Sequence, residues 1–209
     1  MTDLIKGDTA LIVDECKARG VLRNQCAYVL ATTFWETART MKPVREYGSE
    51  AYLKKKGYYP YVGMGYVQLT WEANYKRAGD ELGVDFLADP RKLLDAEYAV
   101  KILVNGMVEG WFTGKRLSDY ITLQKSDFLN ARRIINGTDH NVEIAAIAED
   151  YDQALTEDGY GVPTDRVKVA SHGYRDDRLT GARPPGPPGN HQAFWITLAA
   201  LFGRLFYGR

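Results

Sequence analysis

Helical spacing of apolar residues recurs through most of this 209-residue chain, and glycine follows many of the patterned segments. Asp8 is placed to cap a helix that ends at Gly20, and Asn24 is placed to cap a second one. Further helical patterns cover residues 72–82, 95–109 starting from Asp95, 127–136 and 141–156, with stops at Gly83, Gly110 and Gly137. The sequence therefore predicts a mainly α fold.

One stretch, from Pro43 to Gly65, interrupts the helical spacing. Prolines and glycines recur in it, and its tyrosines and the run "YVGMGYVQLT" suit short extended segments better than a helix. We expect a loop-rich region with one or two short strands, which form the small β element of the fold.

The chain changes character after Gly159. The run "RLTGARPPGPPGNHQ" cannot form a helix interior or a central strand, because proline lacks a backbone donor and glycine is entropically costly there. Lys and Arg number 7 against 3 Asp and Glu in residues 160–209, and 20 against 24 in residues 1–159. We predict a globular domain over 1–159, a Pro/Gly-rich linker over 160–190, and an apolar and basic tail helix over 191–209.

The last 17 residues, "AFWITLAALFGRLFYGR", are apolar on nearly every face of a helix. This length is at the short edge of a membrane span, and Arg204 interrupts it. In one interpretation the tail packs on the body and completes its core. In the other, residues 193–207 contact a membrane, with Trp195 and Tyr207 at the interface and Arg204 reaching toward lipid phosphates. Both interpretations stand, and membrane contact is the one we favour.

Composition and spacing argue against several classes of protein. The formal net charge is zero, so no overall basic field attracts nucleic acid. Cys16 and Cys26 are too few for a disulfide scaffold and lack metal or redox spacing; we expect buried thiols, with a bridge between them left open. His140, His172 and His191 lack the close helical spacing of a zinc motif. We predict no metal and no cofactor.

Two glutamates stand on either side of Pro43. Hydrolysis of a glycosidic bond needs one carboxyl that is protonated and one that is ionised. Glu36 comes late in a helical pattern beside Trp35, where the helix dipole and partial burial disfavour its anion. Glu46 lies on a polar loop beside Arg45, a cation that favours the anion if the two side chains meet. Taken singly, either glutamate is more often a solvated surface group.

Three segments, "FWETARTMKPVREYGSEAY", "GMGYVQLTWEANY" and "ARRIINGTDH", resemble in this order glycoside hydrolase family 19, which includes plant chitinases and phage endolysins. The resemblance covers about residues 24–156. It implies a lysozyme-like helical fold with two lobes around a cleft, Glu36 as general acid, and Glu46 as the base that activates water. Met64 and Trp35 depart from the family pattern, which often has arginine and histidine there, but both carboxylates are present.

The resemblance also implies roles for residues near the carboxylates. Thr70 matches a hydroxyl residue that helps to hold the attacking water. Amide side chains can donate to and accept from sugar hydroxyls and N-acetyl groups. The matching amides are Gln68, Asn74 and Asn136. Aromatic rings in the same stretch can stack on sugars, although such rings are often core. The candidates are Tyr58, Tyr59 and Tyr61 and, chosen as substrate-binding residues, Tyr66 and Trp71.

The expected function is that of an endolysin that hydrolyses β-1,4 bonds of bacterial peptidoglycan with inversion. A chitinase acting on poly-GlcNAc is the alternative enzyme, and a non-catalytic membrane-active or glycan-binding protein is the alternative outside enzymes. The start "MTDLIKGDTALIVDECK" has neither a basic start nor an unbroken apolar stretch, so we expect a host-cytoplasmic protein until release to the cell wall. We expect a monomer whose partner is the peptidoglycan strand.

Overall fold

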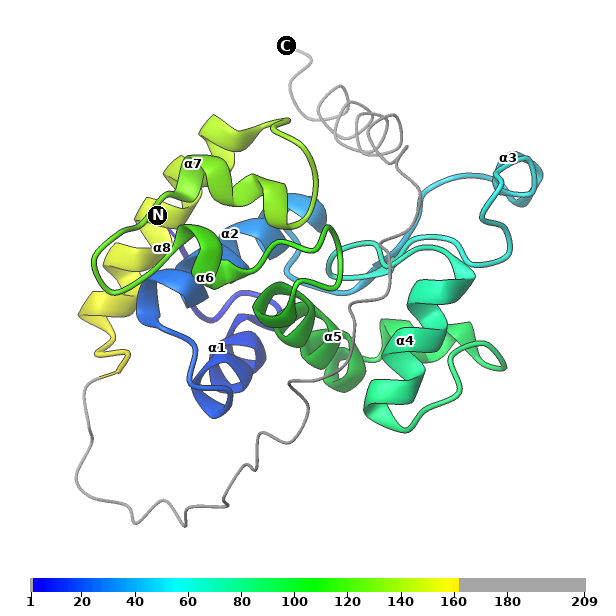
Figure 1. Ribbon diagram of the computed structural model, residues 1–209, viewed down its shortest axis with the longest axis horizontal. Helices are drawn as coiled ribbons and strands as arrows, with labels where there is room; N and C mark the ends of the chain where they lie inside the picture. The colour runs from blue at the N-terminus through cyan, green and yellow to red at the C-terminus, as the bar shows by residue number, and fades with distance from the viewer. Residues whose placement is uncertain (1, 162–209) are drawn as a thin grey trace.

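The protein is described by a computed structural model over residues 2–161, and this part of the chain is mainly helical, as predicted (Figure 1). The longer helices are α1 (Thr9–Ala18), α2 (Arg23–Glu36), α4 (Glu72–Leu82), α5 (Ala96–Glu109) and α8 (Asn141–Glu157). The short ones are α3 (Glu50–Leu53), α6 (Leu117–Tyr120), α7 (Phe128–Ala131) and the 3-10 turns η1 (Pro90–Leu94) and η2 (Arg132–Ile134).

The predicted small β element is present within the loop-rich stretch. Strand β1 (Val44–Arg45) pairs antiparallel with β2 (Met64–Gly65), and Val44 lies opposite Gly65. Met64 also forms a bridge with Leu69, so the chain turns back on itself directly after β2. The β1–β2 hairpin and the turn from Met64 to Leu69 are together called the double turn. It brings residues 44–46 against residues 63–70.

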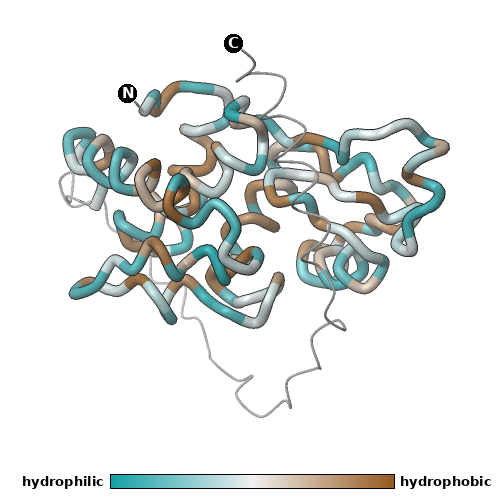
Figure 2. The backbone as a smooth tube through the Cα atoms, turned by 90° about the horizontal axis from the view of Figure 1, so that it is seen from above, coloured by the Kyte–Doolittle hydropathy of each residue, from teal (hydrophilic) through white to brown (hydrophobic). Residues whose placement is uncertain are grey.

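Buried apolar side chains form two clusters. The first cluster unites α1, α2, α7 and α8 and includes Leu30 and Tyr151, and α2 packs most extensively on α8. The second cluster draws its buried members from residues 53–111 and includes Tyr75. Helix α5 serves both, because Leu103 lies in the first cluster and its neighbour in the chain, Ile102, in the second. In Figure 1, α5 lies between the elements of the first cluster and those of the second. Figure 2, a view from above, shows the two parts side by side.

Two of the predicted helix caps are wrong because distant partners take the side chains. Asp8 precedes α1, but its carboxylate pairs with Lys42 Nζ at 2.5 Å and accepts from the Tyr66 hydroxyl at 2.8 Å. Asn24 lies inside the first turn of α2, and its amide donates to the Thr122 carbonyl at 2.8 Å. In both cases the side chain connects segments that are far apart in the sequence.

Both ends of α5 follow local signals, whereas the helix predicted over residues 127–136 does not form as one helix. Asp95 caps α5 by accepting from Glu97 N–H at 3.1 Å, and Gly110 ends it with φ 77°. The predicted helix over 127–136 is instead broken after α7 into the turn η2. Arg132 begins that turn, and its guanidinium is held by groups far from its own helix.

The structure also bears on the predictions for the two cysteines and for the end of the body. Cys16 and Cys26 are free and fully buried, as expected, and a hydrogen bond between the two thiols and burial raise the pKa of Cys16. Tyr160, placed in the linker by the sequence, packs in the first cluster and donates to the Val21 carbonyl at 2.8 Å. The body therefore includes Tyr160. The predicted tail helix and its membrane contact over 193–207 lie outside the described residues.

Candidate active site

Glu36 is the last residue of α2, and its side chain is buried in an ion pair. Its Oε1 accepts from Arg132 Nη1 at 2.6 Å, and the two side chains are 5% and 3% exposed. Arg132 also donates through Nε to the Asp139 carbonyl at 3.1 Å. The pair thus joins the end of α2 to the turn after α7. The other carboxylate oxygen, Oε2, takes no hydrogen bond from the described residues.

The surroundings of Glu36 differ from the sequence prediction in one respect. Burial is as expected, but a guanidinium that the sequence did not predict lies at hydrogen-bond distance from the carboxylate. Arg132 itself was not predicted. Two arginines, Arg132 and Arg133, lie between Ala131 and Ile134, and nothing local in the sequence distinguishes the buried Arg132 from the exposed Arg133.

Glu46 follows β1 and is only 3% exposed. Its Oε1 accepts from the Tyr58 hydroxyl at 2.7 Å, and its Oε2 accepts from Gly63 N–H at 3.1 Å. The backbone repeats the contact, since Glu46 N–H donates to the Gly63 carbonyl at 2.6 Å. Arg45, the cation expected beside it, pairs instead with Glu50 at 2.5 Å. Neutral donors therefore hold this carboxylate.

Tyr58 is suited to remain a donor to Glu46. Burial is the largest cause that raises the pKa of Tyr58 well above its usual value, and the hydrogen bond to Glu46 adds to it. The phenol therefore stays protonated at neutral pH, and a carboxylate is the acceptor that such a donor stabilises.

Gln68 supports the double turn beside Glu46. It adopts a left-handed φ of 53° and donates through Nε2 to the Val44 carbonyl at 3.0 Å. A Cβ at Gly63 would lie 2.7 Å from Gln68 Oε1, so a larger residue there would displace the Gln68 amide from this position. Gln68 is 1% exposed, and its Oε1 is buried without a partner in the described part of the chain. The structure thus uses this predicted substrate-binding amide to hold the hairpin.

Thr70 and Asn74 follow this turn toward α4. The Thr70 hydroxyl donates to the Gln68 carbonyl at 2.7 Å, which leaves its oxygen able to accept a hydrogen bond from water. Asn74 donates through Nδ2 to the Thr70 carbonyl at 2.8 Å, and its Oδ1 accepts no hydrogen bond from the described residues. Thr70 is 8% exposed, so it is buried with only a small accessible area.

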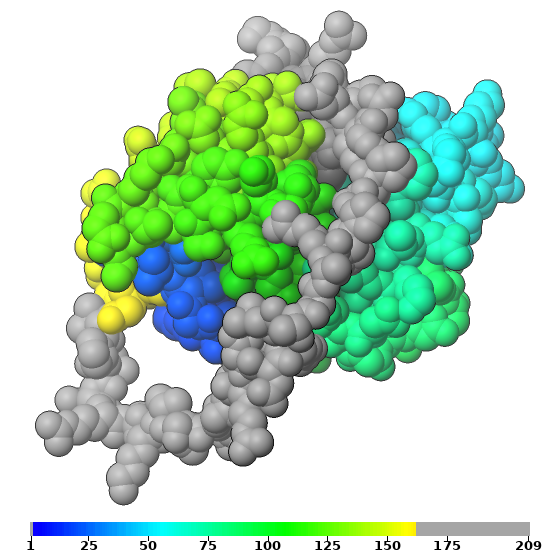
Figure 3. All heavy atoms as spheres, viewed as in Figure 1, coloured from blue at the N-terminus to red at the C-terminus, as the bar shows by residue number. Residues whose placement is uncertain are grey.

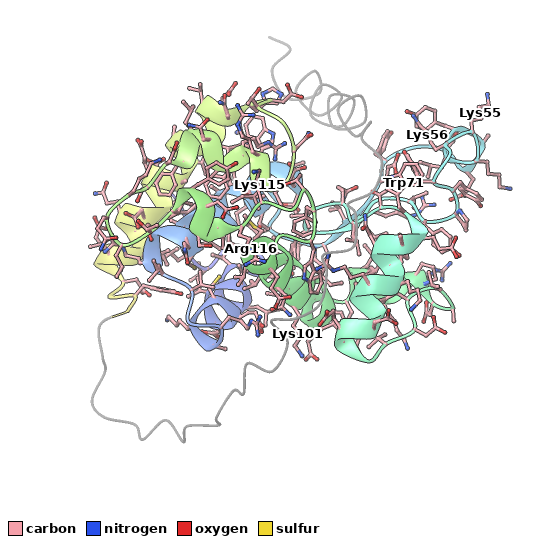
Figure 4. All side chains as sticks on the ribbon, viewed as in Figure 1. Lys55, Lys56, Trp71, Lys101, Lys115 and Arg116 are labelled. Carbon is pink, nitrogen blue, oxygen red and sulfur yellow. The ribbon has the colours of Figure 1, made fainter. Side chains whose placement is uncertain are left out.

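Trp71 has the most unusual backbone of the site. It lies directly before α4 with φ 78° and ψ 141°, a conformation that a bulky residue rarely adopts, yet its side chain is 38% exposed (Figure 4). Its ring packs edge-on against Tyr58, with ring centroids 5.6 Å apart and planes at 70°. The structure therefore connects Trp71 through Tyr58 to Glu46. Sequence reasoning grouped these residues but did not foresee this connection.

Two further predicted residues have different outcomes. Asn136 is buried, and its Nδ2 has no hydrogen-bond partner among the described residues, so it can donate to a ligand. Tyr66 is 1% exposed in the first cluster, with its hydroxyl on Asp8. The prediction that Tyr66 stacks on sugar is wrong, because its ring is enclosed by protein.

No residues within 2–161 form a group of three His, Cys, Asp or Glu side chains able to hold a metal ion. Within the same range, no helix combines the length and apolarity needed to cross a membrane. Comparison of the chain with protein-family models, curated proteins and solved structures finds no match. Its function is therefore inferred from the side chains of the site.

Proposed function

We propose that this chain is an endolysin that hydrolyses β-1,4 bonds of bacterial peptidoglycan with inversion. The observation that carries the proposal is a pair of nearly fully buried carboxylates in contrasting surroundings. Glu36 is paired with a cation, and Glu46 is held by neutral donors. Burial of carboxylates is costly, and differing surroundings are what an acid and a base require. The resemblance to glycoside hydrolase family 19 supports the same pair.

The fold is compatible with that family in its coarse form. The proposal takes the two hydrophobic clusters joined by α5 as the two lobes of a lysozyme-like domain. Glu36 ends a helix of the first cluster, and Glu46 contacts a residue of the second. The cleft between them is part of the proposal. Substrate lying there would meet both carboxylates.

In the proposed reaction Glu46 is the general base. It takes a proton from the water that attacks the anomeric carbon, while Tyr58 and Gly63 fix the positions of its two oxygens. The Thr70 oxygen accepts a hydrogen bond from the same water, which orients a lone pair toward the sugar. Attack from the face opposite the leaving group inverts the anomeric configuration.

Glu36 is the general acid and must carry a proton when the glycosidic oxygen leaves. In the free protein Arg132 donates to Oε1, so the proposal assigns the proton to the other oxygen, Oε2, which takes no hydrogen bond from the described residues. The neutral carboxyl then donates its proton to the leaving oxygen. At the end Glu46 holds the proton from water and Glu36 is ionised, and exchange with solvent restores both.

The proposal is tested by digestion of purified peptidoglycan and of chitin oligomers in parallel. Products are identified by mass and by their new reducing ends, and their anomeric configuration is followed by NMR before mutarotation. We expect muropeptide products of inverted configuration and no products with Glu36→Gln. Cleavage of chitin oligomers alone would favour the chitinase alternative, and retained configuration would rule out attack by water from the opposite face.

A further inference from the structure

Exposed aromatic side chains gather on one segment of the molecule. Within residues 2–161, the exposed tyrosines and tryptophan are Tyr47 (63%), Tyr52 (40%), Tyr59 (36%) and Trp71 (38%). All lie between residues 47 and 71, immediately after Glu46. No large aliphatic side chain of this segment is exposed, since its leucines and valines are buried in the two clusters.

The same segment carries a net positive charge, because its one carboxylate, Glu50, pairs with Arg45, which lies outside the segment. Residues 51–71 include Lys54, Lys55 and Lys56 and contain no Asp or Glu. Lys54 and Lys55 are exposed and have no ion-pair partner in the described part of the chain. The Lys56 ammonium lies over the Tyr52 ring, 4.3 Å from its centroid, so cation and ring occupy one place.

This segment projects from the body and leads back to the site. Figures 1 and 3 show the region around α3 extending from the rest of the molecule, and Lys55 and Lys56 lie at its outer end in Figure 4. At its inner end Trp71 packs on Tyr58, whose hydroxyl binds Glu46. A polymer lying along the projection would pass from the lysines over the exposed rings to the proposed base.

We propose that residues 47–59 together with Trp71 form a docking surface for an anionic glycan strand, which it directs toward Glu46. Aromatic rings stack on the apolar faces of sugars, and lysines provide charges for carboxylate substituents. A neutral glycan would use only the rings. The proposal rests on the proposed function and adds to it the residues that distinguish a carboxylate-bearing amino-sugar polymer from chitin.

The chemistry of the surface favours a glycan over a membrane. Three of the four exposed rings are tyrosines with a polar hydroxyl, and insertion into lipid would use exposed aliphatic side chains, which the segment lacks. The unusual φ of 78° at Trp71 also holds an aromatic ring at the surface, next to a residue that contacts the proposed base.

The test measures binding of the full chain, made inactive by Glu36→Gln, to insoluble peptidoglycan and to chitin by sedimentation at low and high salt. The triple variant Lys54→Gln/Lys55→Gln/Lys56→Gln should weaken peptidoglycan binding by roughly five- to tenfold, because three surface charge contacts are lost. Its remaining binding should depend less on salt, and chitin binding should be unchanged. Trp71→Ala should weaken binding to both polymers.

The matched control replaces three exposed cations on α5 and the loop after it, Lys101→Gln, Lys115→Gln and Arg116→Gln, which lie away from the α3 projection in Figure 4. Circular dichroism checks that each variant is folded. Unchanged peptidoglycan binding of the lysine variant, or an equal loss in the control, overturns the proposal. So does a lysine variant that loses only binding to anionic liposomes. Absence of hydrolysis by the unmodified chain would instead refute the proposed function, because binding is measured separately.

Discussion

The two carboxylates of the candidate site are held in opposite ways. Glu36 ends a 14-residue helix of the first cluster and is fixed by a buried cation. Glu46 lies between a two-residue strand and a loop, and is fixed by a phenol and a backbone amide. Glu36 is held by the attraction between two buried charges, whereas Glu46 is held by neutral donors in closely packed, glycine-rich backbone. Removing a charge should therefore have different consequences on the two sides.

The largest expected effects are on activity, and they should be equal while the effects on stability differ. Glu36→Gln and Glu46→Gln should each lower hydrolysis by about 10²–10⁴-fold, the range for loss of a general acid or base. Glu36→Gln should also lower the free energy of unfolding by about 3–5 kcal/mol, because it leaves the Arg132 charge buried and uncompensated. Glu46→Gln keeps an acceptor among neutral donors and should cost less.

Denaturant unfolding and turnover on purified peptidoglycan measure these two effects. If Glu46→Gln proved the more destabilising of the pair, the contrast between a charged and a neutral setting would be wrong. Wild-type turnover by a folded Glu36→Gln protein would remove Glu36 from the role of acid.

Arg132→Met isolates the charged side of the comparison. Removal of one member of a buried ion pair typically costs about 3–5 kcal/mol of unfolding free energy, because the other charge stays desolvated. In the double variant with Glu36→Gln the loss should be clearly smaller than the sum of the single losses, since no charge is left unpaired. Additive losses, measured by denaturant titration, would mean that the two side chains do not interact in solution.

Tyr58→Phe makes the matching change on the neutral side. It removes the hydroxyl that donates to Glu46 at 2.7 Å and keeps the ring that packs on Trp71. The rate should fall roughly tenfold, the equivalent of one hydrogen bond to a charged group. Turnover on purified peptidoglycan measures the loss, and denaturant unfolding checks the fold. An unchanged rate in a folded Tyr58→Phe protein would remove Tyr58 from the positioning of Glu46.

The two sides also differ in how far the sequence predicts them. Helix α5 was predicted within a residue or two at each end, because Asp95 and Gly110 act through local geometry. The burial of Glu36 followed from the apolar spacing of α2. Its partner Arg132 lies 96 residues away, and no local pattern connects the two. A second long-range contact, the hydrogen bond from the Tyr66 hydroxyl to Asp8, engages the carboxylate that was predicted to cap α1 and accompanies the burial of the Tyr66 ring.

The surroundings of Glu46 were harder to predict because they depend on unusual backbone geometry. Gln68 and Trp71 both adopt positive φ, and propensity argues against that for either residue. These turns place Tyr58 and Gly63 on the carboxylate and turn the predicted substrate amide of Gln68 toward Val44. Sequence reasoning named both carboxylates as candidates and expected burial for Glu36 alone; the burial of Glu46 and the groups that hold both carboxylates come from tertiary structure.

Thr70→Val tests a smaller contribution on the neutral side. The hydroxyl donates to the Gln68 carbonyl, and in the proposed reaction its oxygen accepts from the attacking water. The rate should fall by about fivefold, which corresponds to one neutral hydrogen bond of about 1 kcal/mol, with little change in substrate binding. Thr70→Ser is the control and should retain most of the rate. Weaker binding at an unchanged rate would make Thr70 a residue that holds substrate.

The smallest expected effect concerns the cap of α7, the helix that leads to Arg132, the partner of Glu36. Asp127 caps α7, the helix before Arg132, by accepting from Asn130 N–H at 3.1 Å, and it pairs with Lys125 at 2.9 Å. The pairing with Lys125 is the main cause that lowers the pKa of Asp127, with the Asn130 bonds contributing and burial opposing. Its stabilisation is therefore complete above the unfolded pKa of about 3.9 and is lost as pH falls through the lower folded value.

Asp127→Ala should cost about 1 kcal/mol near neutral pH, as the loss of a helix cap usually does. Asp127→Asn keeps a capping acceptor, so it should cost less, and its difference from the unmodified chain should narrow as pH falls below about 4, where the native carboxylate also loses its charge. Denaturant unfolding of the three proteins at neutral and acid pH measures both effects. A difference that stays constant with pH would show that the capping hydrogen bond, and not the charge, accounts for the stabilisation by Asp127.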